Sequence, residues 1–394
     1  MILLPRCDVN NMSASDIQLS GNILTPAGFI QGELTIQNGK IAAISGEAID
    51  EPTVRSSAEA VILPGFIDLH VHGGAGHDIM EGGEAARHVA GIHARHGTTS
   101  LLATTMTAPA EDLLVAFRAM AEICHAPSNG DKSDGKSGGA RILGVHLEGP
   151  FINAAMLGAQ PAFARPLAMN EIEQLNSLVP IRVITLAPEV PGNLQLIPGL
   201  VAAGFIVQLG HTTGTYEEGA AAIANGARGF THLFNAMTGM HHRKPGMVGA
   251  ALAHAEYAEI IPDLLHVHPG AIHVALRAIP KLFCVTDSTA AAGMPDGEYR
   301  LGRHTVTKCM GGVRLADGTL AGSSLTMDQA LANLVNLLGL TLTEASRRVS
   351  TNAADYLRLA DRGRIAVGAW ADVVVLNGDL KLTNVYVEGN EIER

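Results

Sequence analysis

The chain has 394 residues, of which 47% are hydrophobic and 16% charged, and its formal net charge is -11. This acidic balance argues against a nucleic-acid partner or an anionic membrane surface. No apolar run approaches the ~18 residues that span a bilayer, and the start, MILLPRCDVNN, has too short an apolar stretch and no basic lead for a signal peptide. The four cysteines lack CxxC spacing. We therefore expect a cytoplasmic protein without disulfides.

The first sixty residues and the extreme C-terminus are predicted to form short strands. Stretches such as GFIQGELTIQNGKIAAIS and GRIAVGAWADVVVLNGDL are β-branched, are punctuated by Gly and Asn, and lack helical periodicity. Between them, one low-complexity stretch, SNGDKSDGKSGG at residues 128–139, is predicted to be a solvated loop.

The middle of the chain alternates apolar runs of strand length with Ala-rich helical segments, which is typical of repeated βα units. Eight such runs occupy residues 61–72, 98–106, 141–150, 181–189, 205–212, 229–237, 259–267 and 281–289. Eight units over about 250 residues predict an α/β fold of the (β/α)8 TIM-barrel type. A doubly wound sheet is the alternative, but it usually has fewer strands, and no GxGxxG or Walker motif supports a nucleotide site.

Residue types that bind metals or transfer protons recur at the carboxyl ends of six of the eight runs. In a (β/α)8 barrel, catalytic groups come from the carboxyl ends of several strands. The residues are His70 and His72, Glu148, His211, His232 with Asn235, His266, and Asp287. His70 and His72 share one strand face because side chains alternate with period two. His146, two positions before Glu148, receives no role.

The candidate ligands are imidazole nitrogens and carboxylate oxygens, without a thiolate. This donor set favours Zn²⁺, Fe²⁺, Mn²⁺ or Co²⁺ over copper or an iron–sulfur cluster. A catalytic ion of this kind keeps one position for water and lowers the pKa of that water to about 7, so that a metal-bound hydroxide becomes the nucleophile. Asp287, on the eighth run, is the natural general base for the water and then the acid for the leaving group.

Five stretches make the chain similar to a known family. PGFIDLHVHG (64–73), followed by His on the fifth and sixth runs and Asp on the eighth, resembles the amidohydrolase superfamily. The resemblance is narrowed to the N-acetylglucosamine-6-phosphate deacetylase family by GVHLEGPFIN (144–153), THLFNAM (231–237), HHRKPGMVGAAL (241–252) and VTDSTAAAGMPDG (285–297). It covers nearly the whole chain. It implies hydrolysis of the acetamide of N-acetylglucosamine 6-phosphate to acetate and glucosamine 6-phosphate.

The resemblance also implies a fold and a metal centre. The expected fold is a catalytic barrel at residues 61–357 and a small β-sandwich domain formed by residues 1–60 and 358–394. The principal metal ligands correspond to Glu148, His211 and His232. Because this chain keeps His70 and His72 where some relatives have other residues, a second ion is expected, with Glu148 as the bridging carboxylate.

The resemblance further implies the substrate contacts. The catalytic aspartate corresponds to Asp287, and His266 corresponds to a histidine that touches the substrate near the scissile amide or the sugar. Asn235, with the backbone of Ala236, corresponds to the phosphate contact. Arg243 corresponds to an arginine that reaches the phosphate bound in the neighbouring subunit, which implies a homodimer. An arginine suits this role because its guanidinium forms two parallel hydrogen bonds with a phosphate.

Two departures from the family pattern concern the substrate. Gln160 stands where many relatives have a substrate-contacting histidine, and it offers a donor and an acceptor but no charge. Leu264 stands where the strand-seven motif often has glycine, so it adds bulk. N-acetylgalactosamine 6-phosphate is therefore an alternative substrate, since the two sugars differ only at C4.

Two further alternatives belong to other classes. Another amidohydrolase, acting on a cyclic amide or an N-acyl amino acid, would need a carboxylated barrel lysine, yet Glu148 and Glu189 stand at the ends of runs three and four. A non-catalytic sugar-phosphate sensor with the same fold is the other alternative. Such a protein is expected to have lost ligands, and this chain has the full set.

Overall fold

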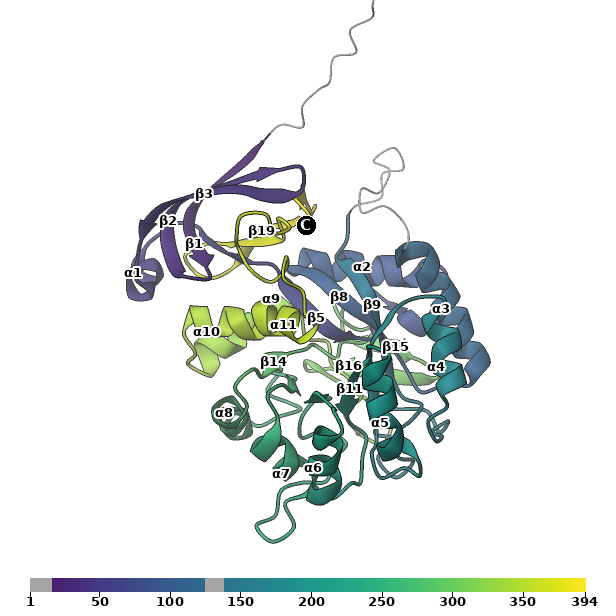
Figure 1. Ribbon diagram of the computed structural model, residues 1–394. Helices are drawn as coiled ribbons and strands as arrows, with labels where there is room; N and C mark the ends of the chain where they lie inside the picture. Colours follow the sequence, from purple (N-terminus) through teal and green to yellow (C-terminus); the bar gives the residue numbers. More distant parts are fainter. Residues whose placement is uncertain (1–15, 125–137) are drawn as a thin grey trace, which may run out of the picture.

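The structure is a computed structural model that describes residues 16–124 and 138–394. The chain forms a barrel of parallel strands surrounded by helices, and a smaller sheet to which both ends of the chain contribute (Figure 1). Most of the predicted low-complexity loop, residues 128–137, lies outside the described residues. In the described ranges, no helix has the length and apolar character needed to cross a membrane.

The barrel contains all eight predicted runs in chain order. Six strands form a parallel sheet in the order β5-β8-β9-β10-β11-β12, and β13 pairs in parallel with β14. The strands are β5 (Phe66–Val71), β8 (Thr98–Thr105), β9 (Arg141–Glu148), β10 (Ile181–Leu186), β11 (Ile206–Leu209), β12 (Gly229–Phe230), β13 (Glu259–Ile260) and β14 (Phe283–Cys284). Two backbone hydrogen bonds of 2.9 Å close the ring, from Leu233 N–H to the Glu259 carbonyl and from Asp287 N–H to the His70 carbonyl. The predicted (β/α)8 barrel is confirmed.

Helices cover the outside of the barrel. They are α2 (Ala85–Arg95), α3 (Ala110–Cys124), α4 (Met169–Asn176), α5 (Asn193–Ala202), α6 (Tyr216–Ala224), α7 (Gly246–His254) and α8 (Pro269–Ala278). The start of α6 shows how sequence fixes an element: the Thr215 side chain accepts from Glu218 N–H, and the Glu218 carboxylate accepts from Thr215 N–H. This capping box satisfies two donors that a helix start would otherwise leave unpaired.

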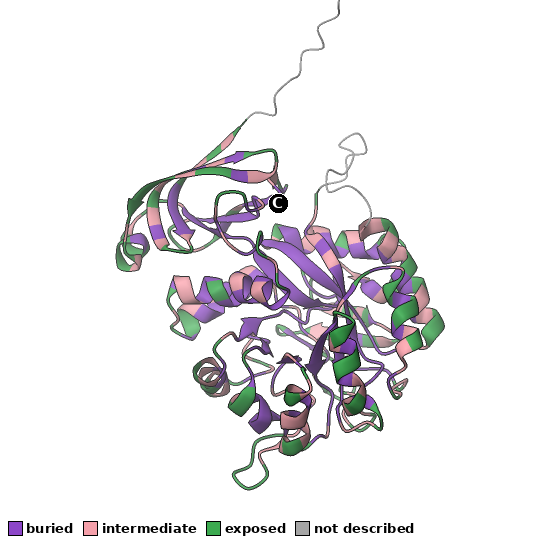
Figure 2. Cartoon of the chain, in the orientation of Figure 1, coloured by how far each residue is buried: buried purple, intermediate pink, exposed green. Residues whose placement is uncertain are grey.

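The barrel strands are buried, including their polar side chains. Every residue of β5 and of β8 is buried, because strands in a parallel sheet are covered on both faces. Figure 2 shows the strands buried and the surrounding helices with exposed outer faces. A polar side chain inside such a strand therefore needs a specific partner, which directs attention to the histidines of β5 and its neighbours.

The smaller sheet joins the two ends of the chain. Its strand order is β20-β19-β18-β4-β1-β2-β3. The strands are β1 (Ile17–Thr25), β2 (Gly28–Gln37), β3 (Lys40–Ala48), β4 (Val61–Pro64), β18 (Val373–Leu376), β19 (Leu382–Val387) and β20 (Asn390–Glu391). The short helix α1 (Glu51–Ser56) follows β3. At the β3 edge of the sheet, Ile41 N–H donates at 2.9 Å to the carbonyl of Ala369, in the segment that precedes β18.

The predicted domain division at residues 60 and 358 stays a prediction. β4 begins the first predicted run, yet it pairs with β1 and β18 in the smaller sheet. That run is therefore two strands, β4 and β5, separated at Gly65. A Cβ at Gly65 would lie 2.3 Å from the Thr99 side chain, so only glycine fits where the chain passes from one sheet to the other.

Shorter elements complete the chain around the barrel. A three-stranded antiparallel sheet follows β14 and consists of β15 (Gly297–Leu301), β16 (His304–Cys309) and β17 (Gly312–Arg314). The small pair β6 (Gly73–Gly74) and β7 (His77–Asp78) and the 3-10 turn η1 (Ile79–Glu81) follow β5. The C-terminal helical segment contains α9 (Met327–Ala332), η3 (Asn333–Leu337), α10 (Leu342–Ser346), η4 (Arg347–Thr351) and α11 (Asn352–Tyr356).

Candidate metal centre and active site

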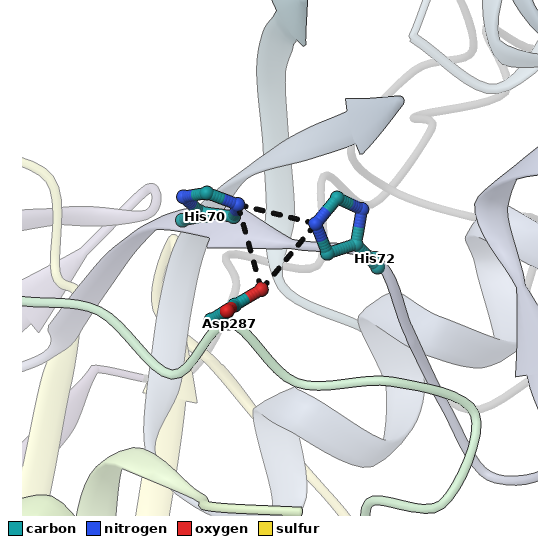
Figure 3. A group of neighbouring side chains, drawn as sticks. All are labelled: His70, His72 and Asp287. Atoms are coloured by element: carbon teal, nitrogen blue, oxygen red, sulfur yellow. Dashed lines mark hydrogen bonds and ion pairs between the residues drawn. The ribbon is translucent and has the colours of Figure 1, made fainter. Parts of the chain in front are cut away.

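The end of β5 carries the first candidate metal group. His70 is 0% exposed and His72 is 3% exposed, and their Nε2 atoms lie 3.1 Å apart. The pairing of β5 with the segment after β14 brings Asp287 to the same point, with its Oδ1 3.5 Å from His70 Nε2 and 3.3 Å from His72 Nε2. Figure 3 shows the three side chains converging from these two segments. Together they form one of the groups that could hold an ion.

The second candidate group lies at the ends of β9, β11 and β12. Glu148 ends β9, and its Oε1 lies 3.2 Å from His211 Nε2 and 3.0 Å from His232 Nε2. The two Nε2 atoms of these histidines lie 3.0 Å apart. Glu148, His211 and His232 are all buried. Three segments far apart in sequence therefore supply one compact set of nitrogen and oxygen donors.

Glu148 joins the two groups into one centre. Its second oxygen, Oε2, lies 3.1 Å from His72 Nε2, while Oε1 lies 3.4 Å from His70 Nε2. The donor set fits a divalent cation, because four imidazole nitrogens converge on two buried carboxylates and no lysine or arginine within ion-pair distance balances these carboxylates in the described chain. The position of Glu148 between the groups is the one expected of a bridging ligand.

Both carboxylates of the centre are held in the anionic form. Burial by itself would raise the pKa of Glu148, but the neighbouring imidazoles, led by His70, outweigh burial and hold this pKa well below its usual value. Burial would likewise raise the pKa of Asp287, and His70 and His72 lower it below the usual value. An anionic Asp287 is able to accept a proton, as a general base must.

Three site residues have a left-handed backbone. The φ angles are 47° at His211, 30° at His232 and 50° at Asp287. Side chains other than glycine rarely adopt this conformation, which costs roughly 1–3 kcal/mol per residue. At these three positions it turns the chain off the strand end into the centre. His211 is also oriented by its Nδ1, which donates to the Met156 carbonyl at 2.8 Å.

A cavity of about 350 Å³ opens above the centre. Most of the residues predicted from the sequence line it: His72, Glu148, Gln160, His211, His232, Asn235, Ala236, His266 and Asp287. His70 lies beneath His72 and is fully buried. Arg243 is exposed on the hairpin at residues 241–244, where its Nη1 lies 2.7 Å from His242 Nε2, and it does not line the cavity of its own chain.

His266 enters the cavity wall with an acidic partner. Its Nδ1 lies 2.7 Å from Asp263 Oδ2, and Asp263 Oδ1 accepts from the backbone N–H of Leu265 and of His266 at 2.9 Å. Burial would lower the pKa of His266, but the Asp263 carboxylate outweighs burial and raises it. The bond at Nδ1 leaves Nε2 for a ligand. Leu264, between these two residues, has a φ of 65°, so the departure from glycine at this position affects the backbone as well as bulk.

Gln160 braces the metal centre in a way that its sequence position did not indicate. Its Nε2 donates to Glu148 Oε2 at 2.5 Å, and its Oε1 accepts from Thr107 N–H at 2.7 Å. Both ends of the amide are therefore engaged with the protein. Gln160 thus positions Glu148, in addition to lining the cavity where a substrate contact was predicted.

Comparisons with known proteins agree with this fold and site. Residues 61–392 match the amidohydrolase family, and the chain belongs to this family of amide hydrolases. It is 38% identical over 364 residues to an N-acetylglucosamine-6-phosphate deacetylase of Lysinibacillus sphaericus, covering 89% of this chain and 91% of the relative. It is also 38% identical over 375 residues to an N-acetylgalactosamine-6-phosphate deacetylase of Escherichia coli O157:H7, covering 93% and 96%. The resemblance inferred from the motifs is confirmed.

Solved structures give the same result. A mutant N-acetyl-D-glucosamine-6-phosphate deacetylase from Mycobacterium smegmatis, in complex with N-acetyl-D-glucosamine-6-phosphate, matches with a TM-score of 0.86 and 33% identity. The match covers 97% of this chain and 100% of that one. The deacetylase of Thermotoga maritima matches with a TM-score of 0.85, 31% identity and a coverage of 96% and 100%. The fold, including the sheet from both chain ends, is therefore that of these deacetylases.

Proposed function

We propose that the protein hydrolyses N-acetylglucosamine 6-phosphate to glucosamine 6-phosphate and acetate. The observation that carries the proposal is the meeting of Asp287 with two histidine groups around Glu148 at the floor of a cavity of about 350 Å³. A cavity of this size suits a small polar substrate. The relatives that cover most of the chain are named as deacetylases of amino-sugar 6-phosphates, which supports the same substrate class.

The centre is suited to divalent metal ions. Glu148, His211 and His232 would hold one ion, and His70, His72 and Asp287 would hold a second, with Glu148 between them. A bound ion supplies Lewis acidity toward the acetyl oxygen and lowers the pKa of water. We propose Zn²⁺, although Fe²⁺, Mn²⁺ and Co²⁺ accept the same donors.

The chain's own residues handle the proton. The Asp287 carboxylate takes a proton from the attacking water and delivers it to the nitrogen of the departing amino sugar as the C–N bond breaks. His266, held at Nδ1 by Asp263, offers its Nε2–H to the acetyl oxygen as charge develops there.

The phosphate requires donors at the far end of the substrate. Asn235 and the backbone N–H of Ala236 line the cavity and are suited to this role. The exposed guanidinium of Arg243 is suited to the phosphate bound in a second copy of the chain, so we propose a homodimer. We also propose a cytoplasmic location, in keeping with the free thiols of Cys124, Cys284 and Cys309.

The galactosamine epimer is the second candidate substrate. Two observations support this second candidate. The relative named for the galactosamine substrate is 38% identical. Gln160 stands where many relatives have a substrate-contacting histidine, and its amide is bonded to Thr107 and Glu148. The test is acetate release from both epimeric 6-phosphates by the purified protein, with metal analysis of the same sample. Asp287→Asn is expected to lower kcat by at least about 10²-fold, as loss of an acid–base group does. Wild-type turnover in that variant would contradict the proposal.

A further inference from the structure

Glu259 is a buried carboxylate beneath the metal centre. It begins β13 and is 0% exposed. Its Oε2 lies 2.9 Å from His70 Nδ1, and the same oxygen accepts from the backbone N–H of His232 at 3.1 Å. One oxygen atom therefore contacts one histidine from each of the two candidate metal groups.

The contact with Glu259 determines which nitrogen of His70 carries the hydrogen and which offers its lone pair to the centre. A neutral imidazole carries one N–H, and donation from Nδ1 to Glu259 leaves the Nε2 lone pair directed at the centre. His70 Nε2 is the atom that lies 3.4 Å from Glu148 and 3.5 Å from Asp287. Hydrogen bonding to a carboxylate also makes an imidazole a stronger metal ligand.

The grouping of Glu259 with His70 and His146 is therefore a support and not a third ion site. This trio also lies close enough together to hold a cation. Both nitrogens of His146 are engaged, however, with Nδ1 3.1 Å from the Leu69 carbonyl and Nε2 2.7 Å from Thr185 Oγ1. The Nδ1 of His70 is likewise committed to Glu259.

Glu259 also holds the backbone that presents His232. The φ of His232 is 30°, and its N–H points to the Glu259 carboxylate. The next N–H, of Leu233, donates to the Glu259 carbonyl at 2.9 Å. Side chain and main chain of one residue thus fix two successive peptides in a conformation that costs energy on its own.

The charge of Glu259 would be stabilised by metal ions bound in the two candidate groups. In the described chain, its only ion-pair contact within 4 Å is with His70, and no lysine or arginine accompanies it. A buried carboxylate without a cation is strongly unfavourable. We propose that Glu259 is a positioning residue that sets the tautomer of His70 and the backbone of His232, and so couples the two ion sites through one oxygen. This inference rests on the metal-dependent function proposed above.

The test compares Glu259→Gln and Glu259→Met with Glu189→Gln. Glutamine keeps an acceptor oxygen and removes the charge, and methionine removes both hydrogen bonds. Glu189 is the control, because it is a half-buried carboxylate that follows β10 and that, among the described residues, accepts from Asn153, Thr212 and Thr213 and from none of the candidate ligands. Co²⁺ affinity is measured by chelator competition and by the visible spectrum of the bound ion. Thermal unfolding is measured with and without metal.

We expect Co²⁺ binding to weaken about tenfold in Glu259→Gln and about a hundredfold in Glu259→Met, as losses of carboxylate partners of metal-binding histidines do, and to be unchanged in Glu189→Gln. Metal-free Glu259→Gln is expected to unfold at or above the wild-type temperature, since it buries one charge fewer. Wild-type affinity in both Glu259 variants, or an equal loss in the control, overturns the inference. An equal loss of unfolding temperature with and without metal also overturns it, since that indicates a purely structural role. Because affinity is measured without substrate, absent acetate release would overturn only the proposed function.

Discussion

Leu264 carries a conformation that glycine adopts more easily than any other residue. Its φ is 65°, and its side chain packs, half-buried, against the main core. A left-handed backbone costs an L-residue roughly 1–2 kcal/mol, while a half-buried leucine side chain contributes about 1 kcal/mol through burial. The two effects are of similar size, so the packing of Leu264 offsets the strain it introduces beside Asp263 and His266.

We expect the usual order of glycine and alanine to be reversed at this position. Leu264→Ala loses the packing and keeps the strain, and it should lower the free energy of unfolding by about 1 kcal/mol. Leu264→Gly loses the packing but relieves the strain, so its change should be smaller, under about 0.5 kcal/mol. Urea denaturation of both variants is the measurement. The same pair of substitutions at exposed Leu265 serves as the control, and an alanine variant more stable than the glycine variant at position 264 would contradict the expectation.

The candidate ligands that the structure brings together could be proposed from the sequence, whereas the residues that support them could not. His70, Glu148 and Asp287 are chemically suited residues at strand ends, where a barrel gathers its functional groups. Gln160 and Glu259 act through hydrogen bonds to segments far away in sequence, Thr107 for the first and His232 for the second. Glu259 also stands at the start of its run. The one available signal was a glutamate inside a buried apolar strand, which requires a partner.

At the scale of elements, β5 supplies both histidines of the proposed second ion site. It is wholly buried, and its end places His70 and His72 against Asp287 and Glu148. The strands that supply His232, His266 and Asp287 are much shorter than their predicted runs: β12, β13 and β14 have two residues each. The rest of each run is irregular chain. A backbone that turns its side chains into a cavity no longer forms the regular hydrogen bonds between neighbouring strands. Apolar periodicity predicts the strand and gives no information on where it breaks.

Replacing both β5 histidines tests the number of ions. We expect His70→Gln/His72→Asn to reduce the metal content from two ions to one per chain, because Glu148, His211 and His232 remain. Elemental analysis after exhaustive dialysis is the measurement. His93→Gln is the control, since His93 is buried and bonds to the Gly73 carbonyl outside all three groups. If wild-type protein held one ion per chain and the double variant also held one, His70 and His72 would have a packing role and would not bind metal.

At the scale of the whole molecule, a buried ion-pair network stabilises the smaller sheet, to which both ends of the chain contribute (the chain-end sheet). Arg362 bonds to Asp372 and to Glu388, and all three are buried. Asp372 also accepts from Glu388 N–H at 2.8 Å. Removing one member of a buried ion pair leaves the remaining charge buried without a partner, which lowers stability. Replacing all members with apolar residues often leaves stability unchanged.

We expect Arg362→Met to lower the free energy of unfolding by about 3–5 kcal/mol. Trp370, the single tryptophan of the chain, lies 5.2 Å from the Arg362 guanidinium and reports the unfolding of this region by fluorescence. The triple variant Arg362→Met/Asp372→Leu/Glu388→Leu should recover most of the loss. A loss below about 1 kcal/mol for Arg362→Met would mean that the network contributes little.

Mixing of subunits tests whether Arg243 acts across a dimer. Arg243→Ala should raise KM for the phosphorylated sugar at least tenfold with little change in kcat, because a charge-assisted hydrogen bond contributes about 1.5–3 kcal/mol. Asp287→Asn should be inactive. Random pairing of the two variants in a symmetric dimer should restore about a quarter of wild-type activity at the wild-type KM, since each mixed dimer has one intact site. No restoration would show that Arg243 acts in its own chain or not at all.

The order of strands in the chain-end sheet also affects how the protein is made. β1, β2, β3 and β4 are synthesised before the barrel, yet the neighbour of β4 on one side is β18, which follows the barrel in the chain. One edge of β4 stays without its partner while the entire barrel is being synthesised, and exposed edges invite aggregation. We infer that completion of this sheet is a late event in biosynthesis, and that synthesis interrupted before Val373 leaves β1 to β4 without the strand that pairs with β4.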